Sequence, residues 1–76
     1  MIEKKDLELV FQAWYDHKME PENPELLRIH RSTMDSLKSK METLLGYPIT
    51  IVALRQSIGA RFGVWMTENG LPKPPK

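Results

Sequence analysis

Two clusters of helix-breaking residues divide this chain of 76 residues. The first is PENP at positions 21–24, and the second is GYP at positions 46–48. Proline lacks the backbone N–H that a helix interior needs, and glycine readily adopts the conformation that closes a helix. Each remaining segment is long enough for one helix. We therefore expect an all-α fold, a compact three-helix domain with helices at about residues 3–19, 24–45 and 50–68.

The first segment carries apolar residues at helical spacing. One face is formed by Leu7, Val10, Phe11 and Trp14. Their spacing of i, i+3, i+4 and i+7 places them on the same side of a helix. A thinner apolar stripe lies away from that side and consists of Ile2, Leu9 and Ala13. We expect this second stripe to remain partly exposed.

The second segment has the clearest end signals. Asn23 can accept a hydrogen bond from a free backbone N–H, Pro24 suits the first helical position, and Gly46 can close the helix. The apolar seam of this helix consists of Leu27, Met34, Leu37, Met41 and Leu44, with His30 in the position left open. One flank alternates in charge at ion-pair spacing, with Arg31, Asp35, Lys38 and Glu42.

The third segment has an apolar face and an uncharged back. Thr50 can cap its start. The apolar face consists of Ile51, Leu54, Ile58, Phe62 and Trp65, and the back of Val52, Ala53, Ser57, Ala60 and Val64, with Gly59 and Gly63. A helix that is apolar or small all round is typically covered on both sides. Glycine costs about 1 kcal/mol relative to alanine in a helix, so we expect a close neighbour at Gly59 and Gly63 or a break there.

A second interpretation of the C-terminal region is a β-hairpin, which would make the fold α+β. Its strands would be residues 49–54 and 62–67, because β-branched residues are dense in the run ITIV at 49–52. The sequence does not decide whether residues 59–63 form a helix, a turn or a hairpin loop.

The chain has the length of one domain. We expect a single helical domain over residues 1–70 and a flexible, proline-rich tail over residues 71–76. The tail places Pro72, Pro75 and Lys76 in the order of a polyproline-II ligand, a short pattern that is common by chance. The residues expected to be among the most buried are Trp14, Leu37, Ile58 and Trp65.

Composition argues against several classes of protein. Cysteine is absent, so the chain has no disulfide, thiolate metal site or thiol nucleophile. No apolar run is long enough to span a membrane, and the charged start MIEKKD does not resemble a signal peptide. We expect a cytoplasmic protein. The net charge is only +1, whereas nucleic-acid-binding domains usually carry a dense basic stripe.

Few side chains could support catalysis. Asp16, His17 and Glu20 cluster at the end of the first predicted helix, but no second such group completes a metal site. A lone histidine on an apolar seam, such as His30, is usually a core or interface residue with a hydrogen-bonded ring nitrogen. Phosphate-binding, dinucleotide-binding and zinc-protease motifs are absent from the sequence. We expect no enzyme activity, metal, cofactor or small-molecule substrate.

DNA binding is the alternative function. A helix-turn-helix with Gly59 as its turn would place Leu54, Ile58, Ala60 and Trp65 at the expected apolar positions. The match is partial, because Arg55 falls where a small residue is expected. The residues that would contact nucleic acid are Arg61, Arg28, Arg31 and Lys73.

The leading interpretation is a non-catalytic protein-interaction or regulatory module. The three apolar faces offer more surface than three short helices can bury among themselves, which favours a protein partner and a homodimer or larger homo-oligomer. We expect the interface on the third predicted helix and the adjoining stripe of the first. Its candidate residues are Val52, Ala53, Arg55, Ser57, Ala60, Arg61, Val64, Leu9 and Ala13.

Overall fold

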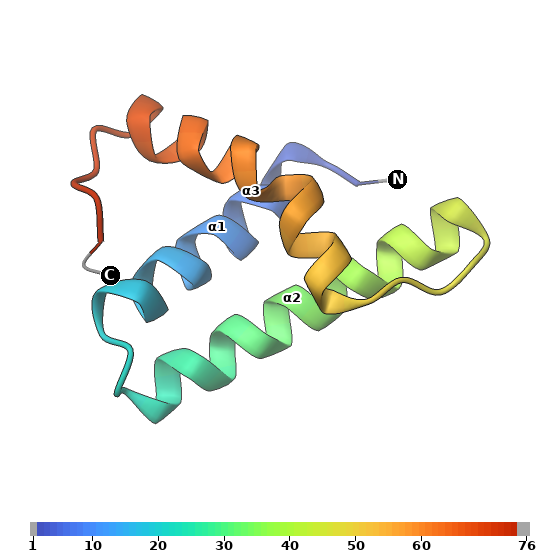
Figure 1. The fold of residues 1–76 in the computed structure, drawn as a ribbon, viewed down its shortest axis with the longest axis horizontal. Helices are drawn as coiled ribbons and strands as arrows, with labels where there is room; N and C mark the ends of the chain where they lie inside the picture. The colour runs from blue at the N-terminus through green and yellow to red at the C-terminus, as the bar shows by residue number, and fades with distance from the viewer. Residues whose placement is uncertain (1, 75–76) are drawn as a thin grey trace.

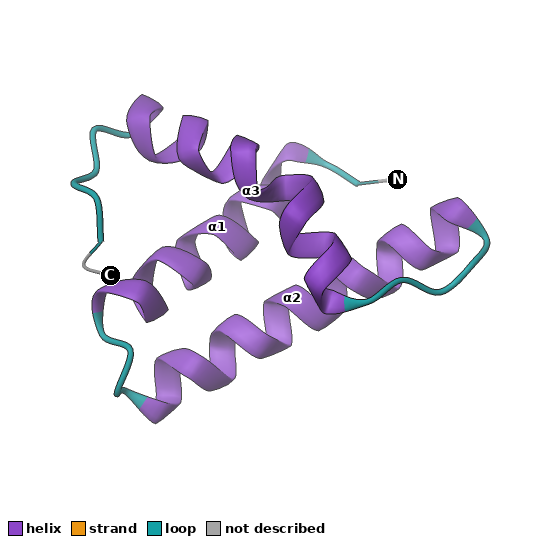
Figure 2. Cartoon of the chain, in the orientation of Figure 1, coloured by secondary structure: helices purple, strands orange, loops and turns teal. Residues whose placement is uncertain are grey.

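The computed structural model describes residues 2–74 and contains three helices in that range. They are α1 (Lys4–Met19), α2 (Pro24–Leu45) and α3 (Ile51–Glu68). Figure 2 shows only helices and loops over the described residues. The predicted all-α, three-helix fold is therefore confirmed, with ends within a residue of those expected.

The helix ends follow from their capping residues. The Asn23 side chain accepts hydrogen bonds from the backbone N–H groups of Glu25 and Leu26, at 3.0 and 3.3 Å. Gly46 has a φ of 79° and closes α2 in the left-handed conformation, where glycine carries no steric penalty. The Thr50 hydroxyl accepts from the Ala53 N–H at 3.1 Å and caps α3. All three residues were predicted from the sequence.

The helices are arranged as an antiparallel pair crossed by a third (Figure 1). Figure 1 shows α1 and α2 running side by side in opposite directions, with α3 passing in front of them. An ion pair joins the first two helices, because Lys40 Nζ lies 2.7 Å from Asp6 Oδ1. On the predicted charged flank of α2, Lys38 and Glu42 form an ion pair at 3.0 Å, whereas Arg31 and Asp35 do not.

The core is built from all three helices. It consists of Val10, Phe11, Tyr15, Met34, Leu37, Leu54, Ile58 and Phe62. Leu54 is 0% exposed. Leu37 and Ile58 are buried as expected, but the expectation for Trp14 and Trp65 is wrong, because both are only partly buried and pack at the edge of the core. Each indole stacks on Phe62, with centroid distances of 4.3 Å for Trp14 and 6.1 Å for Trp65.

Helix α3 is continuous through both glycines. Residues 51–54 and 62–67 are helical, so the structure has neither the hairpin nor the helix-turn-helix turn at Gly59. A methyl group added at Gly59 or Gly63 would meet no side chain and no other helix within 4 Å. The expectation of a close neighbour or a break is therefore wrong for this chain by itself. The packing on the opposite face maintains the helix despite the low propensity of glycine.

The segment after α3 packs against the domain over its described part. The Tyr15 hydroxyl donates a hydrogen bond to the Pro72 carbonyl at 2.8 Å, and Leu71 packs against the core. The start of the predicted flexible tail is therefore held in place. Pro75 and Lys76, which complete the polyproline-like pattern, lie outside the described residues.

None of the helices in residues 2–74 combines the length and apolar character needed to cross a membrane.

Candidate functional site

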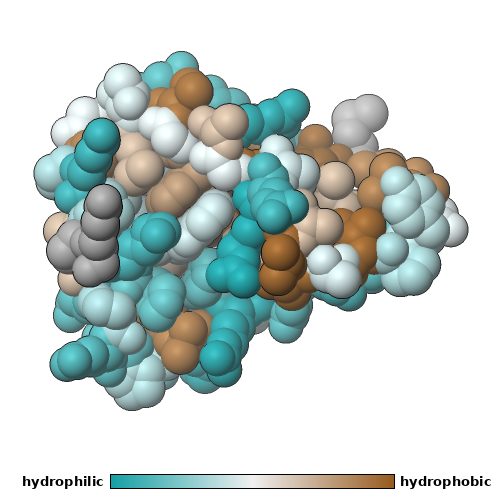
Figure 3. Space-filling view, viewed as in Figure 1, coloured by the Kyte–Doolittle hydropathy of each residue, from teal (hydrophilic) through white to brown (hydrophobic). Residues whose placement is uncertain are grey.

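The back of α3 is exposed and uncharged. We call this surface the α3 face, and it consists of Val52, Ala53, Gln56, Gly59, Ala60, Gly63, Val64 and Thr67. Val52 is 56% exposed and Val64 is 57% exposed. Figure 3 views the molecule from the side on which α3 lies in front, and shows brown and pale surface interrupted by hydrophilic groups. Large exposed apolar patches on monomeric proteins often mark interaction sites, and the exposed valines make this face a candidate for one.

A groove runs between the second half of α3 and the start of α1. It has a volume of about 340 Å³ and apolar walls formed by Leu7, Phe11, Ala60, Val64 and Trp65. Its remaining lining residues are charged and consist of Lys4, Glu8, Arg61 and Glu68. The α3 face therefore continues into an apolar groove with two positive and two negative charges around it. We call this hollow the α1–α3 groove.

The predicted contribution of α1 to the interface is only partly supported. Ala13 is 6% exposed and belongs to the buried residues, so its predicted place at the surface is wrong. The period of α1 turns Ala13 toward the other helices, because it lies three residues from Val10 on the buried side. Leu9 is 64% exposed, but it lines a different hollow with Gln12 and Asn69. That hollow shares Glu8 and Trp65 with the α1–α3 groove.

The two arginines of α3 lie on opposite edges of the helix. Arg61 lines the α1–α3 groove, and together with Ser57 it lines a second hollow beside the start of α1. The Ser57 hydroxyl donates to the Leu54 carbonyl at 2.8 Å, which leaves it no free proton for a partner. Arg55 lines a cleft on the side of α2. The structure thus places Arg55 and Arg61 at opposite edges of the α3 face.

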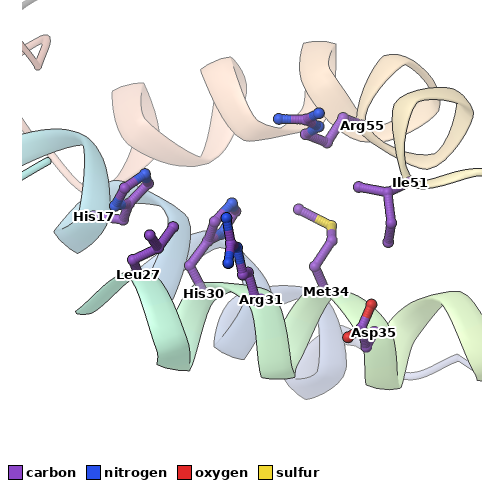
Figure 4. A pocket seen from close by; sticks show the side chains of 8 residues that line it. All are labelled: His17, Leu27, His30, Arg31, Met34, Asp35, Ile51 and Arg55. Atoms are coloured by element: carbon purple, nitrogen blue, oxygen red, sulfur yellow. The ribbon is translucent and has the colours of Figure 1, made fainter. Parts of the chain in front are cut away.

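The cleft between α2 and α3 is a site that the sequence did not reveal. We call it the α2–α3 cleft, and it has a volume of about 370 Å³. Its walls are His17, Leu27, His30, Arg31, Met34, Asp35, Ile51 and Arg55. Figure 4 shows His30, Arg31 and Met34 extending from α2 toward α3, and Arg55 extending over the cleft from the opposite side.

A column of stacked rings connects the core to this cleft. Phe62 stacks on Trp14 with a centroid distance of 4.3 Å, and Trp14 stacks on His30 at 6.1 Å. His30 in turn stacks on His17 at 5.2 Å, with an angle of 11° between the ring planes. The column crosses all three helices, so its order could not be read from spacing within one helix.

His30 is 8% exposed, and its Nδ1 atom has no hydrogen-bond partner among residues 2–74. The pKa of His30 is lowered from 6.5 to about 4, most strongly by burial and also by the neighbouring His17 and the positive side chains of Arg55, Lys18 and Arg31. The expected hydrogen bond at this histidine is therefore absent from the described residues. The imidazole remains neutral at physiological pH.

The candidate nucleic-acid residues come from α2, α3 and the segment after α3. Arg28 pairs with Glu25 on the exposed side of α2. Arg31 lines the α2–α3 cleft, Arg61 lines the α1–α3 groove, and Lys73 is exposed after the end of α3. A continuous basic stripe is the usual footprint of duplex binding, and Arg28 is already paired with an acidic side chain.

The carboxylates at the end of α1 make no metal cluster in the structure. The Asp16 carboxylate accepts a hydrogen bond from the Gln12 side chain at 2.9 Å, and Glu20 is exposed. Over residues 2–74, no three histidine, cysteine, aspartate or glutamate side chains lie close enough to hold a metal ion.

The chain matches no protein-family model, and no curated protein or solved structure matches it. The features that bear on its function are therefore the α3 face, the α1–α3 groove and the α2–α3 cleft.

Proposed function

We propose that this chain is a non-catalytic protein-interaction module that pairs with a second copy of itself through the α3 face. The observation that carries the proposal is the exposed, uncharged back of α3, with Val52 and Val64 more than half exposed. Burying such a surface in a dimer removes apolar area from water, which is the main driving force of association. A small domain gains proportionally more from this burial, because its own core is limited.

The small side chains of the α3 face favour another helix as the covering element. Ala53, Gly59, Ala60 and Gly63 leave the backbone of α3 open to close approach, and both glycines have free space around them. Small residues at a helix surface allow two backbones to pack closely and increase their van der Waals contact. A second α3 presents the same small side chains in return.

The charges beside the α3 face support a two-fold pair. Arg61 and Glu68 lie seven residues apart on one flank of α3, and neither forms an ion pair within residues 2–74. In an antiparallel pair of α3 helices, the same flank of each helix faces the other helix. Arg61 of each copy can therefore meet Glu68 of the other copy. Val64 then lies close to the two-fold axis. The balanced charges around the α1–α3 groove complement a second copy in the same way.

The test is the mass of the protein in solution. We expect a dimer by sedimentation velocity at high micromolar concentration. Val64→Glu brings two like charges together at the axis and should give a folded monomer, with helix content unchanged by circular dichroism. Ile29→Glu is the matched control, because Ile29 is a partly exposed apolar residue of α2 that belongs to neither α3 nor the α1–α3 groove. It should remain dimeric.

A charge swap tests the orientation of the pair. Arg61→Glu alone should weaken the dimer, and the double variant Arg61→Glu with Glu68→Arg should restore it. A wild-type chain that stays monomeric at high micromolar concentration would contradict the proposal. Binding to duplex DNA that disappears between about 50 and 200 mM salt would instead support the nucleic-acid alternative.

A further inference from the structure

We propose that the α2–α3 cleft binds a small organic acid, a molecule with an apolar body and a single carboxylate. The cleft volume of about 370 Å³ lies in the range of small-molecule sites. The proposal is independent of dimerisation, because the cleft lies along the Arg55 edge of α3 and the α1–α3 groove lies along the Arg61 edge.

The walls of the cleft combine apolar and cationic groups. Leu27 and Met34 come from α2 and Ile51 from α3, and they offer an apolar surface. Arg31 extends from α2 toward α3, and Arg55 lies along α3 on the other side of the cleft (Figure 4). Binding sites for small molecules combine apolar walls with convergent polar groups, and polar or charged residues make up five of the eight lining residues here. An apolar body with one anionic group matches this division.

The donors of both arginines are free. Neither Arg31 nor Arg55 forms an ion pair or a side-chain hydrogen bond with any other residue in the part of the chain that the structure describes. A guanidinium group is planar and presents paired N–H donors that match the two oxygens of a carboxylate. Two such groups from different helices can therefore hold one carboxylate between them.

The second, independent observation is the buried histidine. His30 is 8% exposed, its Nδ1 has no partner among residues 2–74, and its ring points from α2 into the cleft (Figure 4). Buried polar groups nearly always have a hydrogen-bond partner in native proteins. A carboxylate in the cleft would place an acceptor beside the imidazole, which carries an N–H donor in its neutral form.

The net charge of the lining favours a monoanion. Apart from the two histidines, the lining carries two positive charges, Arg31 and Arg55, and one negative charge, Asp35. Lys18 of α1 lies near His30 but does not line the cleft. One carboxylate balances the lining, whereas a doubly charged phosphate would lie beside Asp35 with excess negative charge. Asp35 also competes with the ligand, because it lies four residues from Arg31 on the same helix.

Benzoate and benzamide form a matched pair of probes, because they share the ring and differ in the charge. We expect benzoate to shift the His30 and His17 ring resonances in proton–carbon NMR spectra at pH 7 with saturation in the millimolar range. Benzamide should produce no saturable shift at the same concentrations. Equal shifts from the two probes, or no saturable shift from benzoate, would overturn the proposal.

Two arginine variants of α3 locate the effect. Arg55→Gln should weaken benzoate binding about tenfold, because it removes a charge-assisted hydrogen bond. Arg61→Gln removes the same charge from the opposite edge of α3 and should leave the affinity unchanged. Asp35→Asn removes the competing carboxylate and should tighten binding several-fold. Equal affinities of the two arginine variants would also overturn the proposal.

Two further experiments extend this test. One asks which kind of molecule supplies the carboxylate, and the other asks whether binding depends on dimerisation. A dipeptide with a C-terminal phenylalanine carboxylate tests whether a protein terminus can fill the cleft, and its tighter binding than benzoate would assign the site to a peptide end. The Val64→Glu variant should bind benzoate as the wild type does. Loss of the dimer and loss of ligand binding are therefore distinguishable.

Discussion

His30 lies between two rings, in surroundings that resist its protonation. Trp14 stacks on one side and His17 on the other, and the nearest charges of Arg31, Arg55 and Lys18 are all positive. The pKa of His30 is lowered to about 4 by burial and by these charges. The unfolded chain has no such surroundings, so its histidine takes up a proton near the ordinary pKa of 6.5.

This difference predicts a loss of stability in mild acid. Above pH 6.5 both states are neutral at His30, and the stability is fully present. As the pH falls from 6.5 toward 4, the unfolded state gains the proton first, so the free energy of unfolding decreases by up to about 3 kcal/mol. Urea unfolding followed by circular dichroism at pH values across this window measures the decrease.

The control for this prediction is His30→Gln, which keeps a polar side chain without titration in this range. The variant should be less stable at neutral pH, but its free energy of unfolding should vary less between pH 6.5 and 4 than that of the wild type. A slope equal to that of the wild type would show that other groups cause the acid sensitivity.

The burial of single residues was predictable only for residues whose position on their own helix determines it. Leu37 and Ile58 lie at the centre of their apolar faces and are buried as expected. Trp14 and Trp65 share such faces, yet each is partly exposed because a large ring extends past the edge of a small core.

At the scale of the elements, helix ends were the most predictable feature. Asn23, Gly46 and Thr50 act through hydrogen bonds and backbone angles within a few residues of themselves, so short sequence patterns identify them. The continuity of α3 was harder to predict, because Gly59 and Gly63 weaken the helix locally while the core packing of Leu54, Ile58 and Phe62 maintains it.

Helix α3 should become more stable when its glycines are replaced. Gly59→Ala and Gly63→Ala should each raise the free energy of unfolding by about 0.5 to 1 kcal/mol, because alanine loses less backbone entropy and meets no neighbour within 4 Å. Urea unfolding at low protein concentration, where the proposed dimer would be dissociated, measures this gain.

The same two variants test the α3 face at high concentration. In the proposed dimer an added methyl group would separate the two α3 backbones, so the alanine variants should dimerise more weakly than the wild type although each monomer is more stable. Gly46→Ala is the opposite control, because Gly46 has a positive φ and alanine there should destabilise the fold. A loss of stability in Gly59→Ala or Gly63→Ala at low concentration would contradict the prediction.

At the scale of the whole molecule, α1 contacts the segment that follows α3. Tyr15 in α1 donates a hydrogen bond to the Pro72 carbonyl, and Leu71 packs against the core. A proline-rich sequence alone suggests a free tail, because the tyrosine that holds it lies 57 residues earlier in the chain. The α2–α3 cleft escaped sequence analysis for the same reason, since His17, His30 and Arg55 come from three helices.

Removal of residues 71–76 should therefore destabilise the domain. We expect a loss of about 2 kcal/mol, from the buried part of Leu71 and one hydrogen bond. Tyr15→Phe in the full chain should cost about 1 kcal/mol. The same substitution in the shortened chain should cost much less, because the acceptor is gone, and thermal unfolding of the four proteins measures this coupling. Additive losses would show that the contact contributes little.

The stacked column described above also gives the molecule an optical property. Trp14 absorbs and emits light, and its ring lies between the core residue Phe62 and the imidazole of His30. Indole emission depends on charges placed beside the ring, so a change of charge at His30 or in the α2–α3 cleft alters the emission of Trp14. Events in the cleft can thus be followed by intrinsic fluorescence without a label, whereas Trp65 lies on the other side of Phe62 and lines the α1–α3 groove.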